Sequence, residues 1–165
     1  MNYIFTLAFI KKNDEVLMMN RYNQPWKGMW NGVGGKRLST DESPQDCIIR
    51  EIFEETEIEI NKDQLVDKGI VTWNSEPNVY KQGMHLFLVE LPNDFEYQTP
   101  KMTSEGILQW KKLDWINDKE NLGVSYNIPY FIEHVVKDKR RFHYHCTFKG
   151  NNLLDVEVFE LWMNI

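Results

Sequence analysis

The amino-acid sequence predicts an α/β fold in which a mixed β-sheet lies between helices. Three observations lead to this prediction. Strand-like segments precede a well-signalled helix near residue 50, further strand-like segments follow it, and a second helix and a β-hairpin close the chain. A sheet built from strands on both sides of an early helix needs helical cover on its two faces.

Composition and length indicate a folded protein with one domain, expected over residues 1–165. Apolar residues make up 42% of the chain and charged residues 27%, which is typical of a globular protein and excludes disorder throughout. No run approaches the roughly 20 apolar residues of a membrane helix. The net charge of −6 disfavours nucleic-acid binding, which depends on Lys and Arg contacts to phosphate. We therefore expect neither a membrane nor a stably bound nucleic acid as partner.

Cysteine usage and the first residues bear on the cellular compartment. Cys47 and Cys146 lie 99 positions apart without a Cys-x-x-Cys pattern, which predicts two buried free thiols in a reducing cytosol. The opening segment Met1–Ile10 is apolar but short, and it lacks a basic n-region and a small-residue cleavage site. We expect a cytoplasmic protein without a signal peptide.

The first strands are predicted by alternating positions and turn residues. Residues 4–10 place apolar side chains on both faces, as expected for a strand that is covered on both sides. A polar turn at 11–14 leads into a returning strand, Val16–Met19. Four glycines then fall within Gly28–Gly35, which predicts a loop with special backbone requirements.

A helix from residue 44 to about residue 57 has the clearest signals. Ser43 fits the N-cap, Pro44 the first helical position and Asp46 the first turn, near the positive end of the helix dipole. Later elements are predicted as three strands, a helix from about residue 127 to about residue 139, and a hairpin. The strands are Leu65–Trp73, Met84–Glu90 and Ile107–Leu113, and the hairpin pairs Phe142–Phe148 with Leu153–Trp162.

The early helix carries an apolar face and an acidic face. At 100° per residue, Ile48, Ile52 and Phe53 fall on a stripe about 140° wide that faces the core. Three acids share an arc of about 100° on the other side, where they repel one another: Glu51, Glu54 and Glu55. Such an arc fits either a solvated acidic surface or a hard-cation site, since Mg²⁺ and Mn²⁺ prefer carboxylate and carbonyl oxygens. The glycine-rich loop favours the cation site, because glycine lets backbone groups approach a metal or phosphate closely.

The loop and the helix together resemble the Nudix box, G-x5-E-x7-R-E-U-x-E-E-x-G-U, where U is aliphatic. The residues that match in register with the helix are Glu42, Arg50, Glu51, Ile52, Glu54, Glu55 and Ile58. Glu42 is expected to orient Arg50 through a charge-assisted hydrogen bond. There are two departures: six residues rather than five separate Gly35 from Glu42, and Glu57 replaces the late glycine. We expect the first to bulge the loop and the second only to change how the helix ends.

The resemblance implies a Nudix α/β/α sandwich and a hydrolase that uses one to three Mg²⁺ ions, for which Mn²⁺ can substitute. The implied metal ligands are the Gly35 carbonyl, Glu51, Glu54, Glu55 and Glu105. The implied catalytic residues are Glu54 and Glu105, either of which could act as the general base, and Arg50 in support. The reaction is attack of water on a phosphorus of a nucleoside diphosphate derivative, whose negative charge the metal ions neutralise.

Outside the box, the chain is similar to the MutT-like 8-oxo-dGTP diphosphatases, in particular to oxidised purine nucleoside triphosphatases. The similar segments are Tyr3–Leu7, Gly28–Lys36, Trp110–Ile116, Arg141–His143 and Phe148–Gly150. The substrate-binding residues that this implies are Asn31 at the base, Thr6 near the pocket, Arg21 at phosphate, and Lys36. Asn31 also suits a plain turn beside Gly32, and Arg21 a plain surface charge.

One departure bears on the substrate. The relatives carry a Trp-Pro-Asp-Asp run before the last helix, whose aspartates read the oxidised purine, and this chain has no paired acid in register at 120–126. We expect cleavage of a nucleoside triphosphate such as 8-oxo-dGTP to the monophosphate and pyrophosphate, as in nucleotide-pool sanitation for DNA repair. The alternatives are a canonical nucleotide, a nucleotide sugar or an RNA 5′ end and, in a different class, a Nudix binding module without turnover. The aromatic candidates for base stacking are Trp73, Trp110, Trp115 and Tyr126.

Two histidines of the expected hairpin form a weaker candidate. His143 and His145 alternate with Phe142, Tyr144 and Cys146, so they share one face of a strand. A transition-metal site would need a third ligand at suitable spacing, which the sequence does not offer. We expect surface histidines.

Overall fold

A mixed β-sheet forms the middle of the protein in the computed structural model, which describes residues 3–74 and 82–162. Within these residues nine strands form one sheet in the order β6-β7-β2-β1-β5-β4-β8-β9, and β3 pairs with β2. The strands are β1 (Phe5–Lys12), β2 (Glu15–Arg21), β3 (Trp30–Asn31), β4 (Leu65–Trp73), β5 (Gly83–Glu90), β6 (Lys101–Met102), β7 (Gly106–Lys112), β8 (Arg141–Lys149) and β9 (Asn152–Leu161). The pairs β1–β5 and β4–β8 are parallel, and the other pairs are antiparallel.

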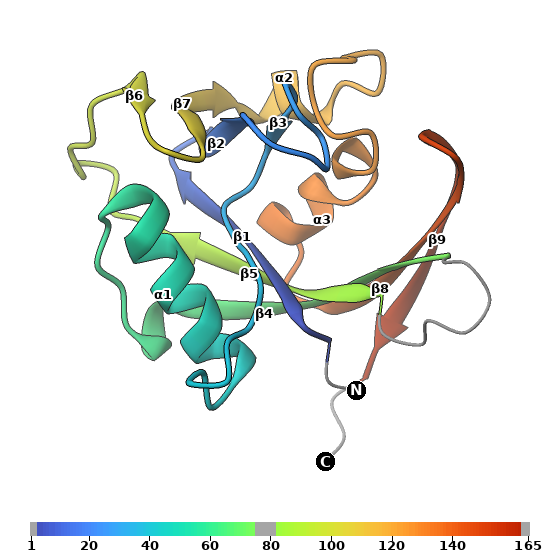
Figure 1. Cartoon of the computed structure of the whole chain (residues 1–165), viewed down its shortest axis with the longest axis horizontal. Helices are drawn as coiled ribbons and strands as arrows, with labels where there is room; N and C mark the ends of the chain where they lie inside the picture. Colours follow the sequence, from blue (N-terminus) through green and yellow to red (C-terminus); the bar gives the residue numbers. More distant parts are fainter. Residues whose placement is uncertain (1–2, 75–81, 163–165) are drawn as a thin grey trace.

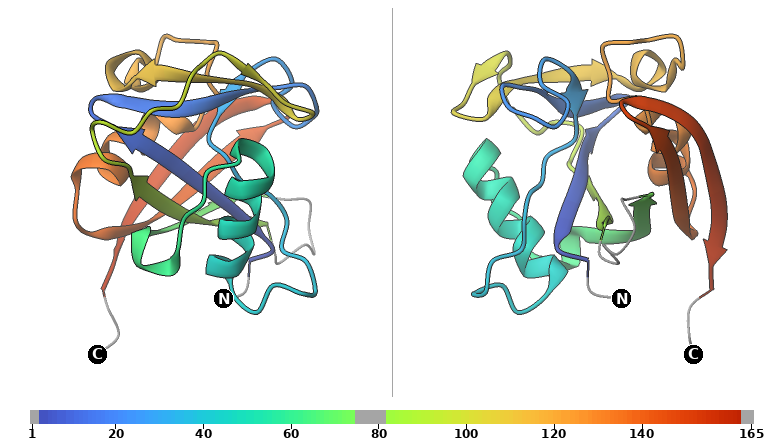
Figure 2. Two further views of the ribbon diagram at one scale, coloured as in Figure 1. Left: turned by 90° about the vertical axis from the view of Figure 1, so that its left-hand side faces the viewer. Right: turned by 45° about the vertical axis from the view of Figure 1, so that its right-hand side comes forward.

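Helices cover the two faces of this sheet, as Figures 1 and 2 show. The helices are α1 (Pro44–Thr56), α2 (Leu113–Asn117) and α3 (Ile132–Lys137), with short 3₁₀ turns η1 (Lys62–Gln64) and η2 (Ile128–Tyr130). Ile48 and Ile52 of α1 pack on one face with Ala8 and Ile10 of β1. The other face packs against α2, η2 and α3. The predicted α/β fold with helices on both faces of a mixed sheet is confirmed, and none of the helices in the described ranges is long and apolar enough to span a membrane.

The predicted strand at 4–10 is confirmed as a strand that is covered on both faces. Phe9 belongs to the core beneath α3, Ala8 and Ile10 belong to the core beneath α1, and all three are fully buried. Buried side chains on both alternating faces are what the continuous apolar pattern predicted.

Helix α1 begins and ends as the sequence indicates. The Ser43 side chain accepts a hydrogen bond from the Asp46 N–H, and Pro44 stands in the first turn. Glu57 ends the helix in the left-handed conformation, with φ of 63°, and its N–H donates to the Phe53 carbonyl. The prediction that Phe53 faces the core is wrong, because this side chain is 49% exposed. The buried side chains of α1 are instead Cys47, Ile48, Ile52 and Thr56.

The region before the hairpin differs from the prediction. The expected helix from about residue 127 to about residue 139 is divided into η2 and α3, because Phe131 leaves helical geometry at φ −133° and ψ −16°. The strand expected to end at Leu113 ends at Lys112, and Leu113 and Ile116 instead bury their side chains in the short helix α2. The β8–β9 hairpin is confirmed, with Gly150 at φ 58° in its turn. Cys47 and Cys146 are buried free thiols, as predicted.

Candidate active site

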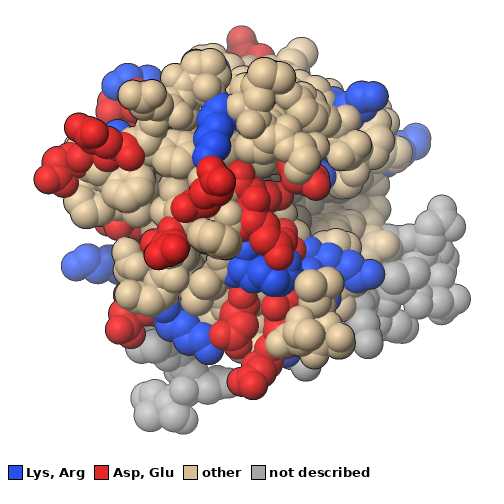
Figure 3. All heavy atoms as spheres, turned by 60° about the vertical axis from the view of Figure 1, so that its left-hand side comes forward, with Lys and Arg blue, Asp and Glu red and all other residues tan. Residues whose placement is uncertain are grey.

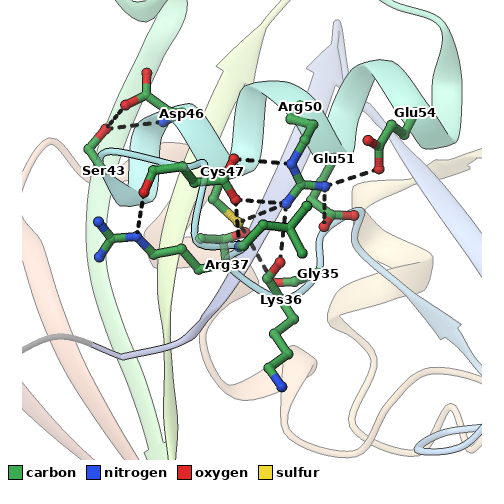
Figure 4. A network of polar contacts seen from close by, with 12 residues as sticks. Gly35, Lys36, Arg37, Ser43, Asp46, Cys47, Arg50, Glu51 and Glu54 are labelled. Carbon is green, nitrogen blue, oxygen red and sulfur yellow. Dashed lines mark hydrogen bonds and ion pairs between the residues drawn. The ribbon is translucent and has the colours of Figure 1, made fainter.

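On helix α1, the Arg50 side chain lies among the carboxylates of the acidic face (Figure 4). The Arg50 Nη1 donates to Glu51 Oε1 at 2.8 Å and to Glu54 Oε2 at 3.0 Å. These contacts engage one oxygen of each carboxylate and reduce the repulsion between the two acids. The expected cluster of acids on one face of the helix is therefore present, with the arginine of the box inside it.

Asp41, not Glu42, orients Arg50. The Arg50 Nε and Nη2 donate to the two oxygens of Asp41 at 3.1 and 2.9 Å, in a bidentate pair. Glu42 is exposed, and its backbone carbonyl accepts a hydrogen bond from Arg37. The expected Glu42–Arg50 hydrogen bond is therefore wrong. The Arg50 guanidinium lowers the pKa of the nearly buried Asp41 from 3.8 to about 2.

The longer loop explains this exchange. The Asp41 Oδ2 also accepts the Leu38 N–H at 2.8 Å, and the Asp41 N–H donates to the Leu38 carbonyl, so residues 38–41 form a tight turn. Five residues separate Gly35 from Asp41, which is the spacing that the Nudix box has between its glycine and its first glutamate. The additional residue thus lies between Asp41 and the helix, and Glu42 is displaced toward solvent.

Two glycines allow the loop to pack closely against its neighbours. A Cβ on Gly34 would lie 2.1 Å from the Thr6 carbonyl oxygen, and a Cβ on Gly35 would lie 2.4 Å from Glu51 Cδ. The Gly35 carbonyl accepts the Thr6 N–H at 2.9 Å, which fixes its position beside α1. A carbonyl oxygen has a second lone pair, so this bond leaves the oxygen able to bind a cation.

Glu55 is the most strongly perturbed acid of the site. Its Oε2 accepts the Gly34 N–H at 3.2 Å. Burial, followed by repulsion from Glu51, raises the pKa of Glu55 to about 8, and burial also raises the pKa of Glu51. Burial and mutual repulsion both disfavour the ionised forms of these two carboxylates. A divalent cation bound between them would offset both effects, so the pair is a favourable place for such a cation.

A cavity of about 350 Å³ joins these residues with others that are distant in the sequence. It is lined by Arg21, Gly34, Gly35, Lys36, Glu51, Glu54, Glu55, Ser104 and Glu105. In Figure 3, acidic side chains gather in the middle of this side of the molecule, with basic side chains among them. The structure thus brings together seven predicted residues: the predicted ligands Gly35, Glu51, Glu54, Glu55 and Glu105, and the predicted substrate-binding residues Arg21 and Lys36.

Two predicted substrate-binding residues lie outside the lining of this cavity. Thr6 is 4% exposed, and its hydroxyl lies 3.3 Å from Cys47 Sγ and 3.4 Å from the Gly35 oxygen. Its buried side chain therefore contacts the glycine-rich loop rather than the cavity. Asn31 is half-buried, and its Oδ1 accepts the N–H of its neighbour Gly32 at 2.8 Å, as in a turn. The contact of Asn31 with a base, and the place of Thr6 near the substrate pocket, stay predictions.

The aromatic candidates have different surroundings. Trp110 donates its indole N–H to the Tyr97 carbonyl. The Lys111 Nζ lies 4.8 Å from the centroid of the Trp115 ring. Tyr126 packs edge-on against Trp26 at 5.3 Å between ring centroids. Trp26 has an unusual backbone φ of 64° and was not identified from the sequence. The adjacent Pro25 could have drawn attention to this loop.

The hairpin histidines form a small network of their own. The Thr72 hydroxyl lies 2.7 Å from His143 Nε2 and 2.8 Å from His145 Nδ1.

In the part of the chain that the structure describes, no three His, Cys, Asp or Glu side chains are arranged closely enough to hold a metal ion as they stand. On the acidic face of α1, Arg50 donates hydrogen bonds to Glu51 and Glu54. The donor set and the glycine cradle nevertheless suit a hard cation, because each of these bonds engages a single carboxylate oxygen.

Comparison with known proteins identifies the family. A family model described as the NUDIX domain matches residues 4–135. The chain therefore belongs to the Nudix hydrolase family, whose members act on phosphoric anhydride bonds. It is 29% identical over 143 residues to a Bacillus subtilis relative described as the uncharacterized Nudix hydrolase YvcI, and the match covers 84% of this chain and 82% of the relative.

Solved structures share the fold. A MutT protein from Bacillus halodurans superposes with a TM-score of 0.71 at 24% identity, over 93% of this chain and 95% of that chain. The Nudix domain of Shewanella oneidensis NrtR, solved with ADP ribose, gives a TM-score of 0.60 at 18% identity, over 83% and 88% of the two chains. These likenesses establish the Nudix fold.

Proposed function

We propose that this chain is a Mg²⁺-dependent Nudix hydrolase that cleaves a nucleoside triphosphate to the monophosphate and pyrophosphate, with Mn²⁺ able to substitute. The observation that carries the proposal is the cavity in which Glu51, Glu54 and Glu55 meet the Gly35 loop and Arg21. Carboxylates suit the cation, and the guanidinium suits an anionic polyphosphate.

Each side chain has a proposed task. The Gly35 carbonyl, Glu51, Glu54, Glu55 and Glu105 would hold the metal. A bound divalent cation supplies charge neutralisation, an activated water and stabilisation of the leaving phosphate. Arg50 orients Glu51 and Glu54, and Arg21 and Lys36 contact phosphate. Glu54 or Glu105 takes the proton from the attacking water, since both are exposed at the cavity.

The first candidate substrate is an oxidised purine nucleotide such as 8-oxo-dGTP. Asn31 supports it: because its Oδ1 is engaged by Gly32, its amide NH₂ is the group left to read a base acceptor. The segment before α3 supports a second candidate, another nucleoside diphosphate derivative. Asp118 accepts the Glu120 N–H within that segment, and Ser125 rather than an acid is buried there.

We further propose a single Nudix domain over 1–165 in the cytoplasm, to which the buried thiols are suited.

A nucleotide panel tests the reaction and the metal site together. Pyrophosphate and phosphate release would be measured with Mg²⁺ or Mn²⁺ from 8-oxo-dGTP, the canonical triphosphates, ADP-ribose, nucleotide sugars and a capped RNA 5′ end. Glu54→Gln should abolish turnover, whereas the control Glu59→Gln, at an exposed position past the helix, should keep it. Turnover that survives Glu54→Gln and Glu55→Gln would refute the metal site. No turnover of any substrate by the metal-loaded wild type would favour a binding module.

The role of Asn31 has its own test. If Asn31 reads the base, Asn31→Ala should raise KM for 8-oxo-dGTP about tenfold or more, with a much smaller rise for dGTP. Equal changes for the two nucleotides would show that Asn31 is only a turn residue, and activity centred on another class would move the assignment to the second candidate.

A further inference from the structure

Glu105 stands at the tip of a tight hairpin in which one hydroxyl oxygen accepts two backbone N–H groups. Residues 103–105 join β6 to β7, and the Thr103 N–H donates to the carbonyl of Gly106, the first residue of β7, at 2.9 Å. The Thr103 Oγ1 accepts the N–H groups of Glu105 and Gly106, both at 3.1 Å, and its hydroxyl lies 3.1 Å from the Gly106 carbonyl. We infer that Thr103 is a positioning residue that holds Glu105 at the metal cavity, an inference that rests on the proposed function of Glu105.

The surrounding structure fixes both sides of this turn. The Glu105 carbonyl accepts the Tyr22 N–H at 3.0 Å, and a Cβ on Gly106 would lie 2.0 Å from the Asn20 carbonyl oxygen. At the start of the hairpin, Lys101 forms an ion pair with Glu57 at the end of α1. The hairpin is thus attached to β2 and to α1, and the Thr103 hydroxyl sets the backbone direction between these two attachments.

This direction matters because the backbone of the turn determines where the Glu105 side chain points. Its side chain is exposed, and unlike the three acids of α1 it is not carried by a helix. An exposed glutamate on a loose turn would spend much of its time away from the cavity, and displacements of about 1 Å can lower a rate about 100-fold. Two N–H groups bonded to one hydroxyl reduce that freedom before any ligand binds.

Substitutions separate the hydroxyl from the shape of the side chain. Thr103→Val keeps the shape but removes the acceptor for both N–H groups, whereas Thr103→Ser keeps the acceptor. Thr147→Val is a matched control for the change from hydroxyl to methyl, because Thr147 lies on β8, which four strands separate from β7 in the sheet, and is not part of the cavity lining. Amide hydrogen exchange of Glu105 and Gly106 would be followed by NMR in the metal-free protein, so this first measurement does not depend on activity.

Direct binding of Mn²⁺, measured by calorimetry, and kcat/KM complete the test. We expect Thr103→Val to speed exchange of both amides at least tenfold and to weaken Mn²⁺ binding about tenfold, while Thr103→Ser and Thr147→Val stay within about twofold of the wild type. Because Thr103 acts through Glu105, the double variant Thr103→Val with Glu105→Gln should be no worse than Glu105→Gln alone.

The outcomes distinguish this inference from the proposed function. If Glu105→Gln weakens Mn²⁺ binding but Thr103→Val does not, or if the two effects multiply in the double variant, the positioning role is overturned and the metal site stands. If Glu105→Gln leaves Mn²⁺ binding and turnover unchanged while Glu54→Gln abolishes turnover, Glu105 leaves the proposed site and the inference is overturned with it.

Discussion

Replacing Asp41 by Asn tests which acid orients the arginine of the Nudix box. Asp41 is 8% exposed and forms a bidentate pair with Arg50, at 2.9 and 3.1 Å. Asn has the same shape but lacks the charge. Glu42→Gln is the matched control, because Glu42 stands at the neighbouring position, is exposed and also loses one charge.

The magnitude follows from the pKa of Asp41. A carboxyl group whose pKa is lowered on folding from 3.8 to about 2 contributes about 2 kcal/mol to stability at pH 7. Since the pKa is lowered, this contribution is present above the unfolded value and is lost as the pH falls toward 2, with about half remaining near pH 3. Asp41→Asn should therefore lower the free energy of unfolding by about 2 kcal/mol at pH 7 and lower the melting temperature by roughly 4–8 °C. Glu42→Gln should change the free energy by less than about 0.5 kcal/mol.

Urea denaturation at pH 7 and pH 3, with kcat/KM at pH 7, checks these values. Asp41→Asn should also reduce activity about 10- to 100-fold, because an unheld Arg50 no longer orients Glu51 and Glu54. The reasoning is refuted if Glu42→Gln costs as much as Asp41→Asn in either measurement. It also fails if the destabilisation by Asp41→Asn is as large at pH 3 as at pH 7.

Three further changes test other parts of the site and of the fold. Gly35→Ala places a Cβ 2.4 Å from the carboxylate carbon of Glu51, so we expect Mn²⁺ binding, measured by calorimetry, to weaken at least tenfold; unchanged affinity would show that the loop can move aside. Glu57→Gly removes a side chain from a left-handed position and should stabilise the protein by about 0.5–1 kcal/mol in urea denaturation, because this relief exceeds the small contribution of the exposed ion pair with Lys101; a net loss of stability would contradict this. The pKa of Glu55 is raised from 4.5 to about 8, so the folded state favours the protonated carboxyl group. The stability that this preference contributes is fully present below about pH 4.5 and is lost as the pH rises through 8. Melting temperatures of the metal-free protein should therefore fall from pH 5 to pH 8, and Glu55→Gln should flatten this slope; an equal slope in the variant would contradict the shift.

Local signals explain which parts of the chain could be predicted. Helix α1 was foreseen because its cap, its proline and its apolar period agree, and its acidic face follows from helical geometry alone. Phe53 was misplaced because the helical angle shows which side a residue is on, but not how far the sheet extends beneath the helix. The helix before the hairpin was predicted too long, since Phe131, which is buried in the core, leaves helical geometry within the expected range.

The sequence by itself determined which acids stand together on α1, since the residue types and helical spacing place Glu51, Glu54 and Glu55 on one face whatever surrounds them. Only the tertiary structure decided how that face is completed. It selected Asp41 over Glu42 by folding the additional loop residue into a turn, and it brought Arg21 and Glu105 to the cavity through the pairing of β2 with β7. The physical reason is that helical neighbours are set by a local repeat, whereas contacts between distant segments depend on strand register and loop conformation, which the whole fold fixes at once.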